Sequence, residues 1–268
     1  MVLPGASRPL GRAIARRFGK EGCALLLPVY DWPESIAEME QEFTENGFTF
    51  STFSLDLRNK ADVENFGREL SEQEIQVDYL VNNIERGGMP VVHGSYNSPH
   101  NQNQWELEID TTLKAKWLLY NICFPLMNQA SGGAIINISS IAANSGRSGV
   151  AADLFNDAYS AANRAIQLFT ETWAREAAPG IRVNEVMLGL VDGRHAEGTR
   201  GWPALSSMQR QKINDTILLG RTGHPEEVAE MIYFLAVQAT YMTGATVRLD
   251  GGFSLGHNRV PSMPQGIL

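Results

Sequence analysis

The chain has 268 residues, of which 43% are hydrophobic and 19% are charged. This apolar fraction is enough for a sizeable core and argues against wholesale disorder. The formal net charge of −8 argues against a broad basic face, and so against a nucleic-acid-binding protein. The two cysteines, Cys23 and Cys123, cannot build a disulfide framework and lack the spacing of metal ligands.

The first residues, Met1 to Gly5, contain neither a basic stretch nor a long apolar run, so no signal peptide is predicted. No apolar run approaches the roughly 18 residues of a membrane span. None of the five histidines is paired with another at metal-ligand spacing. We therefore expect a cytoplasmic protein with no membrane contact and no metal site.

Strand-like and helical segments alternate from one end of the chain to the other. In the first half, the pattern predicts strands at 1–3, 24–27, 48–53 and 77–81. Helices are predicted between them, through Ile14 and Phe18, after Asp31, and through Val63, Phe66 and Leu70. Asp31 is the predicted N-cap of the second helix, followed by Pro33 and Glu34 in its first turn. In the second half, it predicts a helix at 105–127, strands at 134–138, 182–187 and 246–249, a helix at 159–176 and a helix through Val228, Met231 and Leu235.

This alternation is typical of crossover units and predicts an α/β fold: one Rossmann-like, doubly wound domain over residues 1–268. Its sheet should be mainly parallel, with about seven strands and helices on both faces. Two polar or mixed stretches, 86–103 and 193–211, interrupt the rhythm. Long loops in a compact domain are often lids or binding loops, and that is the expectation for both.

Seven motifs stand in order along the chain. They are Gly5–Gly11 before the first helix, the strand ends Asp56–Leu57, Asn82–Asn83 and Ser139–Ser140, the helix start Tyr159–Asn163, and two C-terminal motifs, Gly220–Val228 and Tyr241–Gly252. Together they resemble the short-chain dehydrogenase/reductase family over nearly the whole chain. The resemblance implies a nicotinamide cofactor at the carboxyl ends of the strands, and dimers or tetramers.

The catalytic group of that family is usually Asn-Ser-Tyr-Lys. Its Tyr is the acid/base, its Ser orients the substrate oxygen, and its Lys lowers the Tyr pKa and holds the nicotinamide ribose. The resemblance assigns these positions to Thr112, Ser140, Tyr159 and Asn163. Since Asn163 carries no charge, Tyr159 should be a poor base near pH 7, and the retained Ser140–Tyr159 pair is interpreted as vestigial.

The resemblance assigns the cofactor-binding positions to Gly5, Gly11, Asp56 and Asn82. Pro9 lacks an N–H and adds a ring where the family has glycine, although it also suits the first position of a helix. Val29 stands where the family usually has an acidic residue that binds the adenosine ribose. Asp31, two residues later, either binds the ribose in its place or serves only as a helix cap. Glu85 adds bulk and negative charge beside a site for a polyanion. No arginine for a 2′-phosphate is evident, so NAD and NADP are not distinguished.

Ser140 and Tyr159 are 19 positions apart, more than is usual in the family. The segment 151–157 therefore resembles an insertion beside the mouth of the site. If this segment loops out of the fold, Ser140 and Tyr159 can still lie next to each other.

The substituted positions coincide with cofactor and catalytic positions, while the apolar periodicity of the core is intact. We therefore predict a non-catalytic subunit that binds no cofactor itself and pairs with an active paralogue, which holds NAD, in a hetero-oligomer, expected to be a tetramer. The resemblance implies that such a partner oxidises a hydroxyl group of its substrate to a ketone. One candidate for that substrate is a hydroxyacyl-CoA. It also implies that the helices at 105–127 and 159–176 form the dimer face.

Two alternatives remain open. One is an active NAD(P)-dependent alcohol or ketone oxidoreductase that uses Tyr159 and Ser140 alone. The other is a regulatory protein that binds a small molecule on the same fold. Fold class alone does not separate these three possibilities.

Overall fold

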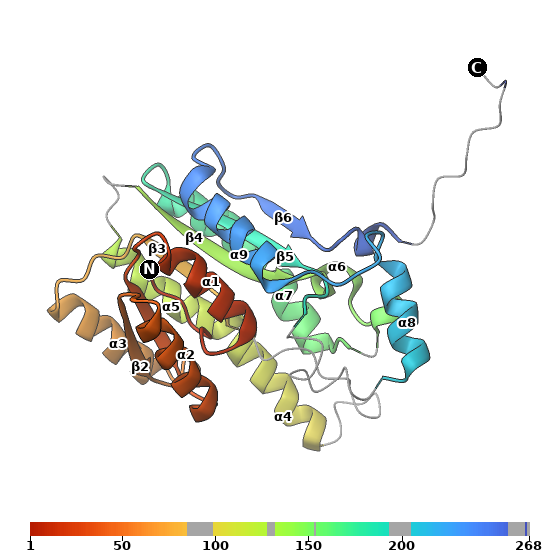
Figure 1. The fold of residues 1–268 in the computed structure, drawn as a ribbon, viewed down its shortest axis with the longest axis horizontal. Helices are drawn as coiled ribbons and strands as arrows, with labels where there is room; N and C mark the ends of the chain where they lie inside the picture. The colour runs from red at the N-terminus through yellow and green to blue at the C-terminus, as the bar shows by residue number, and fades with distance from the viewer. Residues whose placement is uncertain (85–98, 128–131, 153, 193–204, 257–265, 267–268) are drawn as a thin grey trace.

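The computed structural model describes residues 1–84, 99–127, 132–152, 154–192, 205–256 and 266. A parallel sheet runs through the middle of the protein, with helices packed on both of its faces (Figure 1). The predicted doubly wound α/β class is therefore confirmed.

The strands are β1 (Leu25–Val29), β2 (Phe50–Ser54), β3 (Tyr79–Asn82), β4 (Gly133–Ser140), β5 (Ile181–Leu188) and β6 (Thr246–Leu249). β1 pairs with β2, and β3 to β6 pair in sequence order, all in parallel. Val2 connects the two groups through parallel bridges to Leu26 and Leu80. The predicted strand at 1–3 is thus reduced to one bridging residue, because Pro4 follows at once and has no N–H for a ladder.

Two hydrophobic clusters hold the helices against the sheet. On one face lie α1 (Pro9–Gly19), α2 (Pro33–Glu45) and α9 (Pro225–Tyr233); on the other lie α3 (Lys60–Glu72), α5 (Ala115–Cys123) and α7 (Asp157–Ala177). The predicted long helix at 105–127 begins earlier, as α4 (Pro99–Glu108), and continues into α5 through a π-helical turn at Ile109–Lys114. Short helix α6 (Ala142–Ser145) and helix α8 (Ser207–Thr216) lie near the carboxyl ends of the strands (Figure 1).

The predicted cap of the second helix is wrong. The N-cap of α2 is Trp32, with a left-handed backbone (φ 73°, ψ 63°) and no side-chain cap hydrogen bond, and Asp31 lies outside the helix. Proline disfavours a helical conformation in the residue before it, so Pro33 fixes the helix start there. The Trp32 ring instead stacks under the guanidinium of Arg8, 4.5 Å from its centroid.

The expected loop at 193–211 is partly helical. α8 begins at Ser207 and is stabilised by a capping box between Ser206 and Gln209, a pattern that the sequence interpretation overlooked. The remainder of that stretch, 193–204, and the stretch 85–98 lie outside the described residues.

The described part of the insertion at 151–157 packs inward rather than looping out. Leu154 and Phe155 are buried in a cluster with Tyr159, and the rings of Phe155 and Tyr159 stack with centroids 6.0 Å apart. Buried Asn156 caps α7, since its Oδ1 accepts a hydrogen bond of 2.7 Å from the Tyr159 N–H. The extra residues therefore fix the start of the helix that carries Tyr159.

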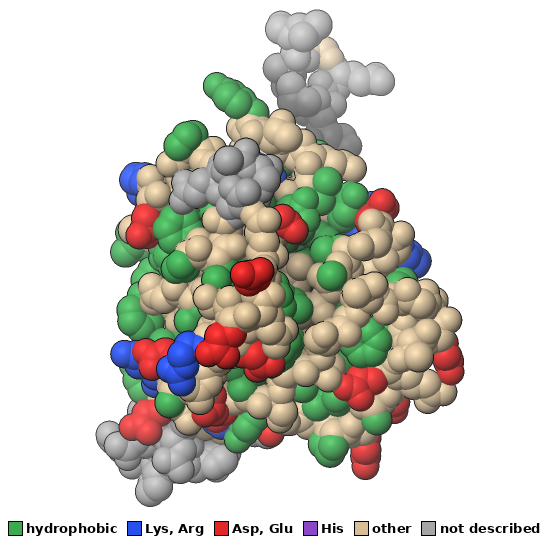
Figure 2. Space-filling view, turned by 90° about the vertical axis from the view of Figure 1, so that its left-hand side faces the viewer, with side chains coloured by type: hydrophobic (Ala, Val, Ile, Leu, Met, Phe, Trp, Pro, Cys, Tyr) green, Lys and Arg blue, Asp and Glu red, His purple; other side chains and the backbone are tan. Residues whose placement is uncertain are grey.

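The surface agrees with the acidic composition. On the face shown in Figure 2, Asp and Glu side chains are spread widely, while the few described Lys and Arg side chains stay close to them. Within the described residues, every helix is too short or too polar to span a bilayer.

Candidate functional site

The candidate site forms where the carboxyl end of β4 meets the start of α7 and the π-helical turn before α5. Ser140 ends β4, and the Ser140 hydroxyl hydrogen-bonds to the phenol of Tyr159, the third residue of α7. Asn163 lies one turn along α7, and its Nδ2 donates to the Tyr159 carbonyl at 2.9 Å. Thr112 lies in the adjoining π-helical turn and is fully buried. The fold therefore places residues from all four positions of the family's catalytic group on these adjoining elements.

Burial is the main influence on the Tyr159 hydroxyl. The side chain is only 4% exposed, and this burial raises its pKa well above the ordinary value of 10. Hydrogen bonds to Ser140 and Asn163 lower the pKa and the charge of Glu108 raises it, but burial dominates. Burial thus favours the neutral phenol of Tyr159 near neutral pH, and in this form the hydroxyl can donate a hydrogen bond.

Glu108 is a component of the site that sequence interpretation missed. It is buried, its Oε2 accepts from the Thr112 hydroxyl at 3.5 Å, and its Oε1 accepts from the Asn156 side chain at 3.5 Å. The site thus gains a carboxylate beside Tyr159 while Asn163 supplies no cation. The signal was in the sequence, because Glu108 stands four residues before Thr112 and so on the same helix stripe.

Lys116 continues that stripe one turn further and is also buried completely. Its Nζ has no hydrogen-bond partner among the described residues. Burial lowers its pKa to about 7, and the charge of Glu185 opposes this change. Glu185, a buried carboxylate on β5, accepts hydrogen bonds from the hydroxyls of Ser139 and Thr246, and burial raises its pKa.

Asn82, a predicted cofactor-binding residue, takes part in a buried polar network. Its Nδ2 donates to Asn137 Oδ1 at 2.8 Å, and Asn137 donates in turn to the Thr170 hydroxyl at 2.9 Å. Its Oδ1 has no partner among the described residues. These bonds link β3, β4 and α7 beneath the site.

The glycines of the first loop are needed for packing. A Cβ on Gly11 would lie 2.1 Å from the Gly5 carbonyl oxygen. Gly5 itself has a positive φ of 70°, and a Cβ there would lie 2.7 Å from the carbonyl oxygen of Asn83. Pro9 is the first residue of α1, and Arg8 before it is extended (φ −102°, ψ 158°), because proline disfavours helical angles in the preceding residue. The loop is therefore built without the second glycine of the family motif.

In the region expected to bind the adenosine of the cofactor, Asp56 and Arg58 already form an ion pair with each other. Asp56 accepts from Arg58 Nη2 at 2.6 Å and from Arg58 Nε at 2.8 Å, and these bonds lower the Asp56 pKa. The Arg58 guanidinium lies 5.5 Å from the centre of the exposed Tyr30 ring. Val29 is buried at the end of β1.

Two arginines lie at this end of the sheet, although the sequence alone made no arginine evident for a 2′-phosphate. Arg8 lies against Trp32 and Arg58 against Tyr30, so two guanidinium groups are present there. The sequence interpretation missed them because the two arginines are far apart in the chain. Glu85 lies outside the described residues.

The described residues contain no cluster of three or more His, Cys, Asp or Glu side chains placed to hold a metal. The arrangement as a whole offers a hydroxyl pair, buried amides and two buried carboxylates. This set can bind and orient a polar group by hydrogen bonds, while the position of the family's lysine holds an uncharged side chain.

Comparison with known proteins agrees with the motifs. The family described as enoyl-(acyl carrier protein) reductase matches residues 5–254. The chain is 27% identical over 255 residues to a 3-oxoacyl-[acyl-carrier-protein] reductase of Thermotoga maritima, covering 94% of this chain and 96% of that protein. It is 28% identical over 254 residues to a meso-2,3-butanediol dehydrogenase of Serratia marcescens, covering 94% and 93% of the two chains.

Solved structures give the same result. A short-chain dehydrogenase/reductase from Serratia marcescens superposes with a TM-score of 0.79 at 26% identity, covering 94% of this chain and 96% of the other. A glucose/ribitol dehydrogenase from Brucella melitensis superposes with a TM-score of 0.74 at 25% identity, covering 94% of each chain. The chain therefore belongs to the short-chain dehydrogenase/reductase family of oxidoreductases.

Proposed function

We propose that this chain is a catalytically silent member of its family that pairs with and supports an active, NAD-dependent dehydrogenase subunit. The observation that carries the proposal is the pair formed by Tyr159 and Asn163. A phenol this deeply buried needs a neighbouring cation to become a base at neutral pH, and the neutral amide of Asn163 occupies that position.

The cofactor loop and the adenosine end support the same proposal. Pro9 removes one N–H from the helix start that would face a pyrophosphate, and Asp56 is already held by Arg58. A nucleotide that used the Asp56 carboxylate would have to break this ion pair. We therefore propose that the chain binds no nicotinamide cofactor and that NAD is held by the partner.

Exposed aromatic and aliphatic side chains support the pairing. Trp105 is 40% exposed, Trp117 45% and Leu168 63%, on α4, α5 and α7. A contiguous patch of exposed apolar side chains marks a protein contact surface, and we propose that these three side chains belong to one such patch. We propose that this surface contacts the equivalent helices of an active paralogue, in a tetramer.

The partner's reaction is proposed by resemblance alone. We propose that the chain corresponds to the inactive subunit of 2-[hydroxy(phenyl)methyl]succinyl-CoA dehydrogenase, an enzyme of anaerobic toluene degradation. By that resemblance the partner oxidises the hydroxyl of a hydroxyacyl-CoA to a ketone.

Titration of the purified chain with NADH and NADPH, followed by cofactor fluorescence, tests the silent site. We expect no saturable binding at micromolar cofactor; micromolar binding with turnover would overturn the proposal. Co-expression with an intact family member from the same organism, followed by native mass spectrometry, tests the pairing. A mixed complex that Leu168→Asp disrupts is expected, whereas separate homo-oligomers would contradict it.

An active oxidoreductase is the second candidate. The Ser140–Tyr159 hydrogen bond and the guanidinium group of Arg8, which is suited to a 2′-phosphate, favour this candidate over an inert chain. Activity of the isolated chain with NADPH, lost in Tyr159→Phe, would establish this candidate in place of the first.

A further inference from the structure

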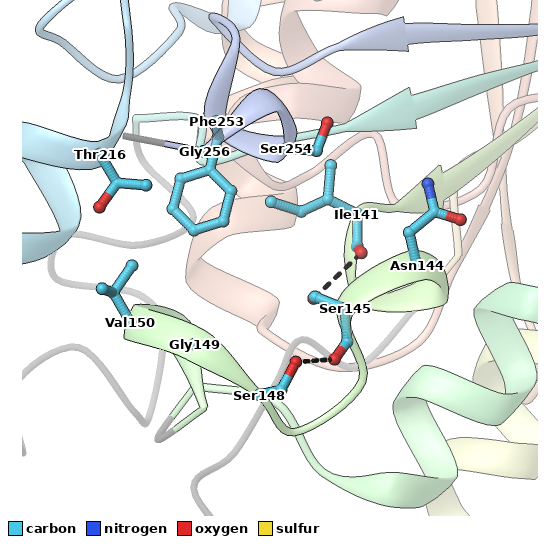
Figure 3. A pocket seen from close by; sticks show the side chains of 10 residues that line it. All are labelled: Ile141, Asn144, Ser145, Ser148, Gly149, Val150, Thr216, Phe253, Ser254 and Gly256. Carbon is cyan, nitrogen blue, oxygen red and sulfur yellow. Dashed lines mark hydrogen bonds between the residues drawn. The ribbon is translucent and has the colours of Figure 1, made fainter. Parts of the chain in front are cut away.

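A pocket of about 260 Å³ lies beside the end of β4, next to the hydroxyl site. Three segments enclose it: residues 141–150 after β4, Thr216 at the end of α8, and residues 253–256 after β6 (Figure 3). Neither Ser140 nor Tyr159 is among its described lining residues. The pocket is therefore separate from the hydroxyl pair, although Ile141 adjoins Ser140.

The pocket has an apolar part. Ile141 and Phe253 are both buried in one hydrophobic cluster, and Val150 packs against that cluster. In Figure 3 the Val150 side chain lies below and to the left of the Phe253 ring, and both line the pocket. A flat apolar ring would remove both surfaces from water.

The polar lining can mainly accept hydrogen bonds. The hydroxyl protons of four lining residues are already directed at protein acceptors: those of Ser145, Ser148, Thr216 and Ser254. Each hydroxyl oxygen keeps lone pairs that can accept from a ligand. A ligand that donates a hydrogen bond would match this lining.

No Lys, Arg, Asp, Glu or His is among the described lining residues. A carboxylate, phosphate or ammonium group would lose its hydration there without gaining a counter-charge. The volume of about 260 Å³ is also below the roughly 300–1,000 Å³ that is typical of ligand pockets. These two facts restrict the ligand to a neutral molecule with one ring.

The long connection between Ser140 and Tyr159 builds one wall of the pocket. Gly149 and Val150 belong to it, and Gly149 needs its positive φ of 71° to make the turn. Leu154 and Phe155 anchor the same connection in the core. The connection that carries the extra residues thus also contributes one wall of the pocket.

We propose that this pocket binds a neutral monocyclic alcohol, with the ring against Phe253 and Val150 and the hydroxyl donating to the oxygens of the lining. The site goes beyond the role of a silent subunit, because it needs neither a cofactor nor a partner. It gives the chain a ligand of its own.

Three probes that share one ring test the charge preference: benzyl alcohol, benzoate and benzylamine. Isothermal titration or ligand-observed NMR on the full chain, with no cofactor or partner present, gives each Kd. We expect benzyl alcohol to bind saturably, with a Kd at least tenfold lower than that of either charged probe. Equal binding of all three, or no saturable binding of benzyl alcohol, would overturn the proposal.

Val150→Trp fills the pocket and should weaken benzyl alcohol at least tenfold. Tyr241→Trp is the matched control, since Tyr241 is fully exposed and does not line the pocket. If the two variants bind benzyl alcohol equally strongly, the ligand does not bind in the pocket lined by Val150.

Thr216→Val is a second variant that nearly conserves volume, and it decides the matter if Val150→Trp does not fold. It should weaken benzyl alcohol about threefold or more and leave benzene, which has no donor, unchanged. The same loss for both probes would rule out the hydrogen-bonding role. Cofactor titration is a separate measurement, so failure of the pocket and failure of the silent-subunit proposal are distinguishable.

Discussion

Asn163 donates a hydrogen bond of 2.9 Å from Nδ2 to the carbonyl of Tyr159, one turn earlier on α7, and its Oδ1 has no partner among the described residues. The amide thus serves the helix backbone at the position where the family's lysine would act on the phenol. This local geometry leaves Tyr159 without a cationic neighbour on its own helix face.

Replacing Asn163 with lysine should therefore lower the pKa of Tyr159. The new ammonium favours the phenolate by charge attraction, against the burial that raises the pKa in the native chain. NMR of ¹³Cζ-labelled tyrosine across pH, assigned with Tyr159→Phe, measures the change. Asn163→Gln is the neutral control, and an identical titration of Tyr159 in both variants would contradict the argument.

Lys116 should make stability depend on pH. Its pKa is about 7 when folded against an ordinary 10.5, so between these values the unfolded chain binds a proton that the folded protein has released. The free energy of unfolding should then rise with pH across this window, by up to about 5 kcal/mol, and fall as pH drops towards 7.

Urea unfolding from pH 7 to pH 9.5 tests this. Lys116→Met should flatten the rise, and Lys114→Met, at an exposed position two residues away, should keep it. A slope that survives Lys116→Met would show that another group is responsible.

The insertion should contribute to stability through Phe155. The side chain is 3% exposed, and truncation to alanine should cost about 3–5 kcal/mol in the free energy of unfolding. Leu168→Ala, at a position 63% exposed, should cost less than about 0.5 kcal/mol in the isolated chain. Similar small losses in both variants would mean that the insertion is not anchored as described.

Gly11→Ala should destabilise the protein in the absence of any nucleotide. Its Cβ would meet the Gly5 carbonyl at 2.1 Å, so the loop must shift, at a cost of about 2 kcal/mol or more. Gly223→Ala is the control, because the nearest atom to its Cβ is 3.7 Å away. If Gly11→Ala unfolds at the same urea concentration as the native chain, the glycine does not serve packing.

Local pattern was enough for the architecture. Alternating apolar runs predicted the parallel sheet, and the motif register placed Ser140, Tyr159 and Asn163 on the elements where they occur. The prediction of Asp31 as the N-cap of α2 was wrong because two local signals indicated different first residues for this helix. The capping side chain of Asp31 favoured an earlier start, and Pro33 determined the start that the structure shows.

The sequence by itself determined the fold class, since hydrophobic periodicity records which face of each element is buried, and it determined that position 163 carries no charge. Only the tertiary structure decided what surrounds that position. Glu108, Lys116 and Glu185 are ordinary charged residues in the sequence, and they become a buried group because α4, α5 and β5 meet beneath the site. Their influence depends on distance and on exclusion from water, and both are set only when segments distant in the chain pack together.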